Sequence, residues 1–291
     1  MKQLLILSGK GGTGKTTLSG AFIHLSQARA CADCDVDAPN LHLINRKTKA
    51  PETSDFYGLP KAKIDQDKCK PCGICMENCR FNAITFRNNR YEVDPLACEG
   101  CSLCIELCPH RAIEPIPSVS GELMLYADPE SIFSTAQLKT GSGNSGKLVT
   151  EVKKRMKEGA PKNTPLAIID GSPGIGCPVI ASLSGVDAVL FVAEPSLSGI
   201  SDLERVVKTA RTFQLSCAVC INKYDLNLER TREIEAFCSR MEIPCVGRIP
   251  FDATVNRAIN QGLCVSQMPG PAQAAIETIY QNITRLIESA P

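Results

Sequence analysis

The chain has 291 residues, with 32 Lys and Arg against 31 Asp and Glu, 43% hydrophobic residues, 16 Cys and no Trp. This length and near-zero net charge argue against a disordered protein and against a broad polyanion-binding surface. No apolar run approaches the roughly 20 residues that span a bilayer, and Met1 leads into a strand-like run instead of a signal peptide. We therefore expect a cytoplasmic protein without a membrane partner, whose cysteines stay free or bind metal.

Apolar runs of strand length alternate with helix-period segments along most of the chain. The predicted strands are Gln3–Leu7, Leu166–Ile169, Ala188–Ala193, Cys217–Ile221 and Cys245–Ile249. The predicted helices are Lys15–Ala28, Lys147–Lys157, Gly199–Phe213, Leu228–Met241 and Ala272–Ser289. Such alternation predicts an α/β fold with a mostly parallel sheet and helices on both faces.

A glycine-rich loop lies between the first predicted strand and the first predicted helix. Residues 9–16 read G-K-G-G-T-G-K-T and fit the phosphate-loop pattern G-x-x-x-x-G-K-[ST]. Lys15 would bridge the outer phosphates of a nucleotide, and the Thr16 hydroxyl would ligate Mg²⁺. Backbone N–H groups of the loop would surround the phosphate oxygens. The predicted nucleotide-binding residues of the loop are Gly11, Gly12, Thr13, Gly14, Lys15, Thr16 and Thr17.

Three further polar segments follow strand-like runs. Residues 33–41 read D-C-D-V-D-A-P-N-L, and an apolar run before Asp170 ends in the turn G-S-P-G. Residues 221–225 read I-N-K-Y-D and match the N-K-x-D element with which GTPases bind guanine, and residues 249–252 read I-P-F-D. An isolated Asp at a strand end is usually a cap or turn residue. The occurrence of several such motifs in order favours a nucleotide site.

The alternation stops between residues 61 and 117, where cysteines are dense. We interpret this stretch as an inserted α+β domain (the insert), and residues 1–60 and 118–291 as one discontinuous nucleotide-binding domain. Within the insert, one pattern recurs 29 positions later, which predicts two copies of a small unit. The first copy consists of Ile64, Asp65, Cys69, Cys72, Cys75, Cys79, Ala83 and Ile84, and the second of Val93, Asp94, Cys98, Cys101, Cys104, Cys108, Ala112 and Ile113.

Each copy carries the spacing Cys-x2-Cys-x2-Cys-x3-Cys, which is typical of bacterial ferredoxins. In that pattern three cysteines of one loop hold a [4Fe-4S] cluster, and the fourth cysteine binds the other cluster. Zinc also accepts Cys-x2-Cys pairs but leaves the doubled pattern unexplained. Arg80 stands where the first motif usually has proline, which affects the local turn more than the ligation. The predicted ligands are Cys69, Cys72, Cys75 and Cys108 for cluster one, and Cys98, Cys101, Cys104 and Cys79 for cluster two.

The order of these motifs, together with a second lysine in the phosphate loop, resembles the MinD/ParA superfamily of deviant Walker A ATPases, here with an inserted two-cluster ferredoxin domain. The resemblance spans nearly the whole chain. It implies that Lys10 reaches the partner's phosphates across an ATP-dependent homodimer and acts in catalysis with Lys15 and Asp35. In this family the position of Asp35 orients the attacking water. The position of Asp33 faces the Mg²⁺ shell, and that of Asp170 holds Mg²⁺ through water.

The same resemblance implies which residues contact the base of the nucleotide. Superfamily members place an asparagine after the corresponding strand to hydrogen-bond adenine, which implies this role for Asn222. They also carry an Ile-Pro element beside the base, which implies that Pro250 and Asp252 contact it. The N-K-x-D match suggests GTP, but the lysine-rich phosphate loop favours ATP.

The eight cysteines outside the insert have a simpler interpretation. Cys31 and Cys34, like Cys217 and Cys220, are three apart in strand-like runs and therefore face opposite sides. They cannot hold one metal from a regular strand. We expect them to be buried packing residues, together with Cys238, Cys245 and Cys264.

Cys177 has two interpretations, as a cluster ligand or as a structural residue. It follows Asp170 by seven residues, which resembles the position of a cluster ligand in the nitrogenase iron protein. A cluster that bridges two subunits needs two thiolates from each, and no cysteine between Cys108 and Cys177 supplies the second. We expect a structural role.

Together these motifs predict an ATPase that binds iron–sulfur clusters. We expect a nucleotide-dependent homodimer that gates electron transfer through two [4Fe-4S] clusters to a partner protein. The alternative is an ATP-dependent assembly or carrier factor for an iron–sulfur or mixed-metal cofactor, so that the partner accepts a cofactor. The sequence names neither the partner nor the direction of electron flow.

Three other functions are disfavoured. Spatial partitioning on a membrane needs a basic amphipathic helix, whereas the C-terminal stripe of Ile276, Ile279 and Ile283 has no basic opposite face. A nucleic-acid partner is not expected, because the basic helix around Lys153 has no interleaved aromatic residues. Amidotransfer synthesis of the cobyrinic acid diamide type would need a glutaminase Cys and His signature, which we do not find.

Overall fold

The computed structural model describes residues 1–45 and 49–289. Its largest element is a nine-stranded sheet in the order β13-β12-β11-β1-β10-β2-β9-β8-β3. The seven strands from β13 to β9 are parallel, and β8 and β3 form an antiparallel edge. The strands are β1 (Lys2–Leu7), β2 (Ala30–Asp33), β3 (Glu52–Tyr57), β8 (Val119–Ala127), β9 (Ile132–Leu138), β10 (Leu166–Asp170), β11 (Ala188–Ala193), β12 (Ser216–Asn222) and β13 (Cys245–Ile249). The expected α/β architecture is confirmed.

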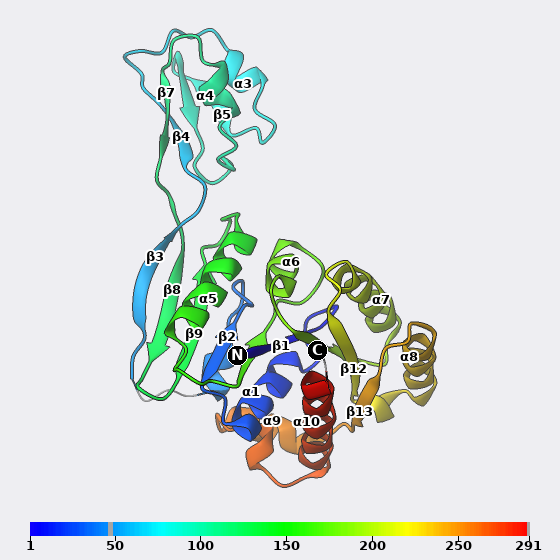
Figure 1. Cartoon of the computed structure of the whole chain (residues 1–291). Coiled ribbons are helices and arrows are strands. Elements are labelled where there is room, and N and C mark those ends of the chain that lie inside the picture. Colours follow the sequence, from blue (N-terminus) through cyan, green and yellow to red (C-terminus); the bar gives the residue numbers. More distant parts are fainter. Residues whose placement is uncertain (46–48, 290–291) are drawn as a thin grey trace.

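Helices cover both faces of this sheet (Figure 1). Helices α5 to α8 pack on one face around residues such as Leu5 and Ile169, and α1 and α10 pack on the other around Leu4 and Ile168. Because neighbouring residues of a strand point to opposite faces, these strands are apolar throughout. The helices are α1 (Lys15–Ser26), α2 (Leu41–Ile44), α5 (Ser145–Gly159), α6 (Cys177–Leu183), α7 (Leu197–Arg211), α8 (Leu228–Arg240), α9 (Ala253–Asn260) and α10 (Pro271–Ser289), with 3-10 turns η1 (Tyr224–Leu226) and η2 (Val265–Gln267).

All predicted strands and helices are present, and no end differs from the prediction by more than two residues. Helix α7 begins earlier than expected because the Ser196 hydroxyl accepts a hydrogen bond from the backbone N–H of Gly199. The C-terminal stripe of α10 packs on the core, as expected. Within the part of the chain that the structure describes, no helix is both long and apolar enough to cross a membrane.

Strands β3, β8 and β9 were not predicted and lie together at one side of the sheet, whereas β2 coincides with the strand-like run around Cys31. Polar residues interrupt their apolar runs. Most of those on β3 are exposed, whereas Ser134 and Thr135 of β9 are buried. Phe56 on β3 and Leu123 on β8 point to the α5 face, where they join the same core as Leu148. Strands β3 and β8 are therefore packed against α5.

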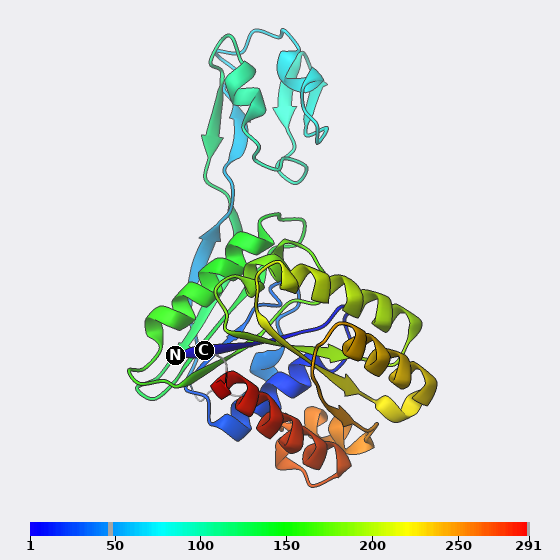
Figure 2. The ribbon, with the colours of Figure 1, turned by 45° about the vertical axis from the view of Figure 1, so that its right-hand side comes forward.

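The insert connects β3 to β8 and lies beyond the edge of the sheet (Figures 1 and 2). It contains two small antiparallel sheets, β4 with β7 and β5 with β6. Its core is small and consists of Ala62, Ile64, Cys75, Ala83, Ile84, Tyr91, Cys98 and Ile113. Its elements are β4 (Lys61–Ile64), α3 (Ile74–Glu77), β5 (Ile84–Arg87), β6 (Arg90–Val93), α4 (Leu103–Leu107) and β7 (Ile113–Ile116).

Strand pairing in the insert follows the internal repeat. Ile64 of the first copy pairs with Ile113 of the second, and Ile84 of the first pairs with Val93 of the second. In each small sheet, the first strand of one copy thus pairs with the last strand of the other copy. This exchange brings the fourth cysteine of each copy toward the first three cysteines of the other.

Candidate functional site

Four parallel strands carry the nucleotide motifs to one edge of the sheet. The phosphate loop follows β1, while Asp33, Asp170 and Asn222 end β2, β10 and β12. In open α/β sheets, ligands bind at this carboxyl edge. A cleft of about 330 Å³ lies here, within the usual range for small-molecule sites. It is lined by all seven predicted loop residues, 11–17, and also by Asp35 and Asn222.

The loop has a backbone that needs glycine. Gly12 and Gly14 adopt φ values of 78° and 90°, in the left-handed region that glycine occupies without strain. A methyl group on Gly14 would lie 2.3 Å from Nδ2 of Asn222, so a larger residue would also clash. That Nδ2 donates to the carbonyl oxygen of Thr13 at 2.7 Å and ties β12 to the loop.

The Thr13 side chain offers a test of whether the loop fits a nucleotide. Its Oγ1 is buried in the loop and has no hydrogen-bond partner among the described residues. A buried hydroxyl without a partner costs free energy. A phosphate oxygen in the cleft would accept from this hydroxyl, so the loop fits an anionic ligand.

Lys15 and Thr16, predicted for phosphate and Mg²⁺, both lie against the carboxylate of Asp170, which is also predicted for Mg²⁺. Lys15 Nζ is 2.9 Å from Asp170 Oδ2, and the Thr16 hydroxyl donates to the same oxygen at 2.7 Å. Ser19, which the sequence analysis missed, donates to Asp170 Oδ1 at 2.6 Å. Burial by itself lowers the pKa of Lys15, but attraction to Asp170 and the hydrogen bond with it outweigh this and raise the pKa.

Asp33 is fully buried and organises the segment that follows β2. Its Oδ1 accepts from the backbone N–H of Asp35, and its Oδ2 accepts from those of Asn40 and Leu41, each at 3.0 Å. Burial raises the pKa of Asp33 to about 7, and the negative charge of Asp170 adds to the shift. The structure therefore gives Asp33 an anchoring contact, and its role at Mg²⁺ stays a prediction.

Asp35 faces the cleft, where a water-orienting group would be needed. Its side chain is 15% exposed, and its Oδ2 lies 3.9 Å from Lys15 Nζ. Burial raises its pKa, which the charge of Lys15 opposes. The predicted catalytic pair Lys15 and Asp35 is thus brought together.

Lys10 does not line the cleft but lies against the loop after β11. Its Nζ donates to the hydroxyls of Ser196 at 2.9 Å and Ser198 at 3.2 Å, and lies 3.5 Å from Glu194 Oε2. Glu194 Oε1 is 3.7 Å from Nζ of Lys223, which also donates to the phosphate loop at Gly12. Glu194 thus holds two lysines beside the loop.

The far end of the cleft has an apolar wall that the sequence analysis did not identify. Pro250 and Asp252, predicted to contact the base, do not line it. Asp252 instead caps α9 by accepting from Thr254 N at 2.8 Å and accepts from Ala272 N at 3.2 Å. The wall is formed by Ile249, Val255, Ile259 and Ile276, with the polar Asn256 beside them in the cleft lining.

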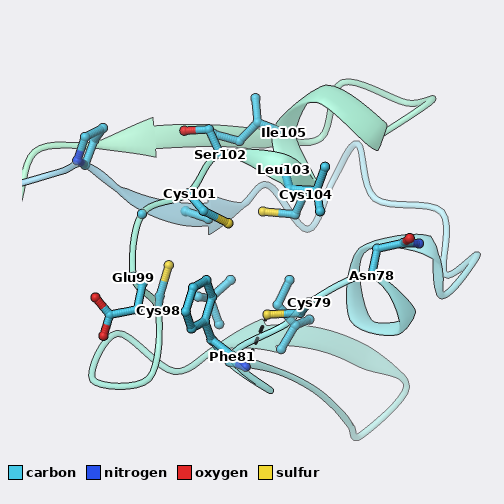
Figure 3. Close-up of a pocket in the computed structure, with 16 residues that line it drawn as sticks. Asn78, Cys79, Phe81, Cys98, Glu99, Cys101, Ser102, Leu103, Cys104 and Ile105 are labelled. Carbon is cyan, nitrogen blue, oxygen red and sulfur yellow. Dashed lines mark hydrogen bonds between the residues drawn. The ribbon is translucent and has the colours of Figure 1, made fainter. Parts of the chain in front are cut away.

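The eight predicted cluster ligands line two separate cavities in the insert. Cys69, Cys72, Cys75 and Cys108 line one cavity, and Cys79, Cys98, Cys101 and Cys104 line the other. Figure 3 shows the sulfur atoms of the second set directed into the same space. Each cavity thus takes three cysteines from one copy of the repeat and the fourth from the other.

The donor set in each cavity consists of four cysteines, which is the set that a [4Fe-4S] cluster takes. Within residues 1–45 and 49–289, no three His, Cys, Asp or Glu side chains lie close enough together to hold one metal ion. In a [4Fe-4S] cluster the four thiolates surround a larger body, whereas one zinc ion would need four sulfurs at about 2.3 Å. Two sulfurs accept backbone N–H bonds at equivalent places of the repeat, Cys79 from Ala83 at 3.4 Å and Cys108 from Ala112 at 3.3 Å.

The thiols of these cavities affect one another. Burial raises the pKa of Cys104 to about 11, and the charges of Cys98 and Cys101 add to the shift. Burial also raises the pKa of Cys69, with Cys108 as the next cause. Metal binding must displace these protons, because the thiolate is the ligand.

The cysteines outside the insert are mostly placed as expected. Cys31 and Cys34 belong to the cores on opposite faces of the sheet, as do Cys220 and Cys217. Cys238 and Cys264 are buried.

Two cysteines outside the insert are exposed. The prediction that Cys245 is buried is wrong, because it lies at the exposed start of the edge strand β13. Cys177 is also exposed, at the first residue of α6.

Comparisons with known proteins agree with this geometry. The family model of the CobQ/CobB/MinD/ParA nucleotide binding domain matches residues 4–265. Uncharacterized protein MJ0578 of Methanocaldococcus jannaschii is 30% identical over 98% of this chain and 97% of its own length. A cytosolic Fe-S cluster assembly factor Nubp1 homolog of Drosophila grimshawi is 24% identical over 97% of this chain and 81% of its own. The septum site-determining protein MinD complexed with Mg-ADP from Pyrococcus horikoshii shares the fold, with a TM-score of 0.58, 16% identity and coverage of 98% and 96%.

Proposed function

The chain belongs to the CobQ/CobB/MinD/ParA nucleotide-binding domain family, and we propose that it couples ATP hydrolysis to two [4Fe-4S] clusters in the insert. Family membership supports ATP, Mg²⁺ and hydrolysis. In the proposal, an ATP-dependent homodimer gates the passage of single electrons between the clusters and a redox partner protein. The observation that carries the proposal is the exchange of the fourth cysteine, because a doubled ferredoxin pattern requires it.

The phosphate end of the cleft suggests how ATP engages the protein. Lys15 and Thr16 now both contact Asp170, a fully buried carboxylate. Phosphate oxygens would take over Lys15, while Thr16 and Asp170 would hold Mg²⁺, which neutralises charge on the transferred phosphoryl group. Ser19 keeps one oxygen of Asp170 fixed during this exchange. Asp35 then remains near Lys15 to orient the attacking water.

Lys10 is proposed to act in trans. In the single chain it is held by Glu194, Ser196 and Ser198. A second copy of the chain would have to present phosphates that compete with these contacts. Since Lys10 is only partly buried, its release costs little compared with burial of an unpaired charge.

The base is proposed to be adenine. In the N-K-x-D match, Asp225 would have to face the base to bind guanine, but it accepts from the backbone N–H of Phe251 at 2.7 Å and does not line the cleft. Asn222 lines the cleft and has donor and acceptor capacity beyond its bonds to Thr13 and Lys223. The Mg-ADP of the Pyrococcus horikoshii MinD supports the same choice.

The test is anaerobic purification of the full chain, with iron and sulfide counts followed by EPR of the reduced protein with and without Mg-ATP. About eight irons per chain are expected, and fewer than about six would contradict two cubane clusters. A Lys15→Ala variant should keep its iron and lose any response to ATP. If the EPR signals of the unmodified chain are the same with and without Mg-ATP, this would contradict the coupling of ATP hydrolysis to the clusters.

The alternative is an ATP-dependent assembly or carrier factor for an iron–sulfur or mixed-metal cofactor. It is supported by the name of the Drosophila grimshawi relative, at 24% identity. An assembly factor would pass a cluster to an apo-acceptor on mixing with ATP, and its iron would fall. An electron carrier would retain its iron while it reduces or oxidises the acceptor.

A further inference from the structure

Glu99 lies where the insert meets the nucleotide-binding domain. It is half-buried between the ligands Cys98 and Cys101 and lines the cavity of cluster two, and Figure 3 shows its carboxylate on the outer side, directed away from the sulfur atoms. It is the one acidic residue among the described residues that line this cavity. The cavity of cluster one is lined instead by Lys70 and His110, with no acidic residue among its described lining. The two cavities therefore differ in local charge.

Glu99 also touches the other domain. A methyl group built on Gly143 would lie 2.7 Å from Oε2 of Glu99, so the carboxylate rests on the backbone of the loop 139–144. Backbone hydrogen bonds hold this loop, from Lys139 N to Ser120 O at 2.9 Å and from Ser142 N to Lys139 O at 2.9 Å. The loop leads directly into α5.

Helix α5 is attached to α6. A methyl group on Gly146, in the first turn of α5, would lie 3.1 Å from the carbonyl oxygen of Cys177, the first residue of α6. Farther along α5, Lys153 Nζ donates to the carbonyls of Ser182 and Ser184 at 2.6 Å each and to that of Ala181 at 3.2 Å. Burial lowers the pKa of Lys153, but these bonds fix it to the end of α6. Helix α6 is thus held against α5 at both of its own ends.

Helix α6 in turn begins directly after the segment 171–176, which follows Asp170 at the nucleotide site. Gly174 N donates to Ser8 O at 3.0 Å, which ties this segment to the start of the phosphate loop. Ser172 donates to the carbonyl oxygen of Cys34 at 2.6 Å, which ties it to the segment after β2. A rearrangement around Asp170 can therefore reach loop 139–144 through α6 and α5.

We propose that Glu99 is a positioning residue through which the nucleotide state sets the reduction potential of cluster two. The inference rests on the proposed function, since it requires the clusters. A carboxylate beside a cluster opposes the added negative charge of the reduced state and lowers the potential. When ATP moves α5 and α6, loop 139–144 moves against Glu99 and changes the distance of this charge from the cluster.

The test is an EPR-monitored redox titration of the full chain, purified anaerobically, with and without Mg-ATP. The signal that disappears in a Cys104→Ser variant identifies cluster two. Glu99→Gln should raise the potential of cluster two and remove most of its shift with Mg-ATP, while cluster one keeps its potential. Glu106→Gln is the matched control, because Glu106 is exposed on the neighbouring α4 and does not line the cavity.

Gly143→Ala tests the same contact from the other domain. Its backbone is not in the left-handed region, so alanine is tolerated, and the methyl group would displace the flexible carboxylate. We expect the potential of cluster two to change without a change in iron content. A chain that binds no iron overturns both proposals. A chain with two clusters whose potentials respond equally to Glu99→Gln and Glu106→Gln overturns only the role of Glu99.

Discussion

The nucleotide-binding domain and the insert each contain eight of the 16 cysteines, and they use them in opposite ways. In the nucleotide-binding domain most cysteines lie singly in the apolar layers. Burial raises the pKa of Cys34 and of Cys238 to about 12, so these thiols stay protonated and act as small hydrophobic residues. In the insert the cysteines surround two cavities and belong to the core itself.

The difference shows where each region obtains its stability. The large sheet buries apolar side chains on both faces, which suffices for a domain of its size. The insert has fewer than 60 residues and a core of eight buried residues, two of which are cysteines that we propose as cluster ligands. A core this small supplies little stability by burial alone, and natural domains of this size often add a metal or disulfides. The insert should therefore depend on its clusters, and the sheet should not.

Removal of the proposed clusters should unfold the insert and leave the large sheet folded. After oxidative loss of iron under chelation, we expect amide hydrogens of β4 to β7 to exchange at nearly the unfolded rate, because binding of the metal contributes to folding. Amides of β1, β10 and β11 should keep their protection. Hydrogen exchange measured by mass spectrometry checks this. Equal protection of the insert with and without iron would contradict it.

Two lysine variants should impair the nucleotide site and leave the iron content of the insert unchanged. Lys15→Ala should lower ATP hydrolysis by more than about 100-fold, as loss of a group that stabilises transition-state charge usually does, and should weaken nucleotide binding. Lys10→Ala should lower hydrolysis similarly and retain binding in the single chain, since Lys10 does not line the cleft. Hydrolysis rates and fluorescent-nucleotide titrations separate the two. Lys208→Ala, on the exposed face of α7, is the control.

Thr13→Val should have a smaller effect. It should maintain or raise the stability of the nucleotide-free protein but lower the affinity for nucleotide. Valine has nearly the shape of threonine and removes a buried hydroxyl that has no partner. The nucleotide-free protein should be as stable as before or more stable, because an unsatisfied polar group is lost. Nucleotide affinity should fall by roughly tenfold, the value of one hydrogen bond to a charged group. Thermal unfolding with and without Mg-ADP measures both, and a loss of stability without nucleotide would argue against this role.

Local patterns predicted much of this molecule. Buried parallel strands such as β11 have long apolar runs, and the phosphate loop has a glycine pattern that few other structures need. The ferredoxin pattern predicted that Cys108 joins the first three cysteines of the other copy, and it lines the same cavity as they do, while their role as ligands stays a prediction. These features depend on residues that are close in sequence or that repeat.

The missed features depend on residues that are far apart. The contacts of Lys10 with Glu194 and of Glu99 with Gly143 join segments that no local period relates. The edge strands were missed because polar residues interrupt their apolar runs, as Ser134 and Thr135 do in β9. Asp252 was assigned to the base, but a helix-capping aspartate has the same local sequence.

The smallest expected effect concerns the cysteines of the nucleotide-binding domain, and it tests the comparison between the two regions directly. With the clusters intact, a thiol reagent at pH 8 should modify Cys177 and Cys245, which are exposed, and leave Cys238 unmodified. Partial burial raises the pKa of Cys245. Its thiolate fraction is therefore small at pH 8, and its labelling rate should still rise above pH 9. Peptide mapping after timed labelling measures each rate. If Cys238 reacted as fast as Cys245, the buried thiols would not be the inert packing residues that distinguish this domain from the insert.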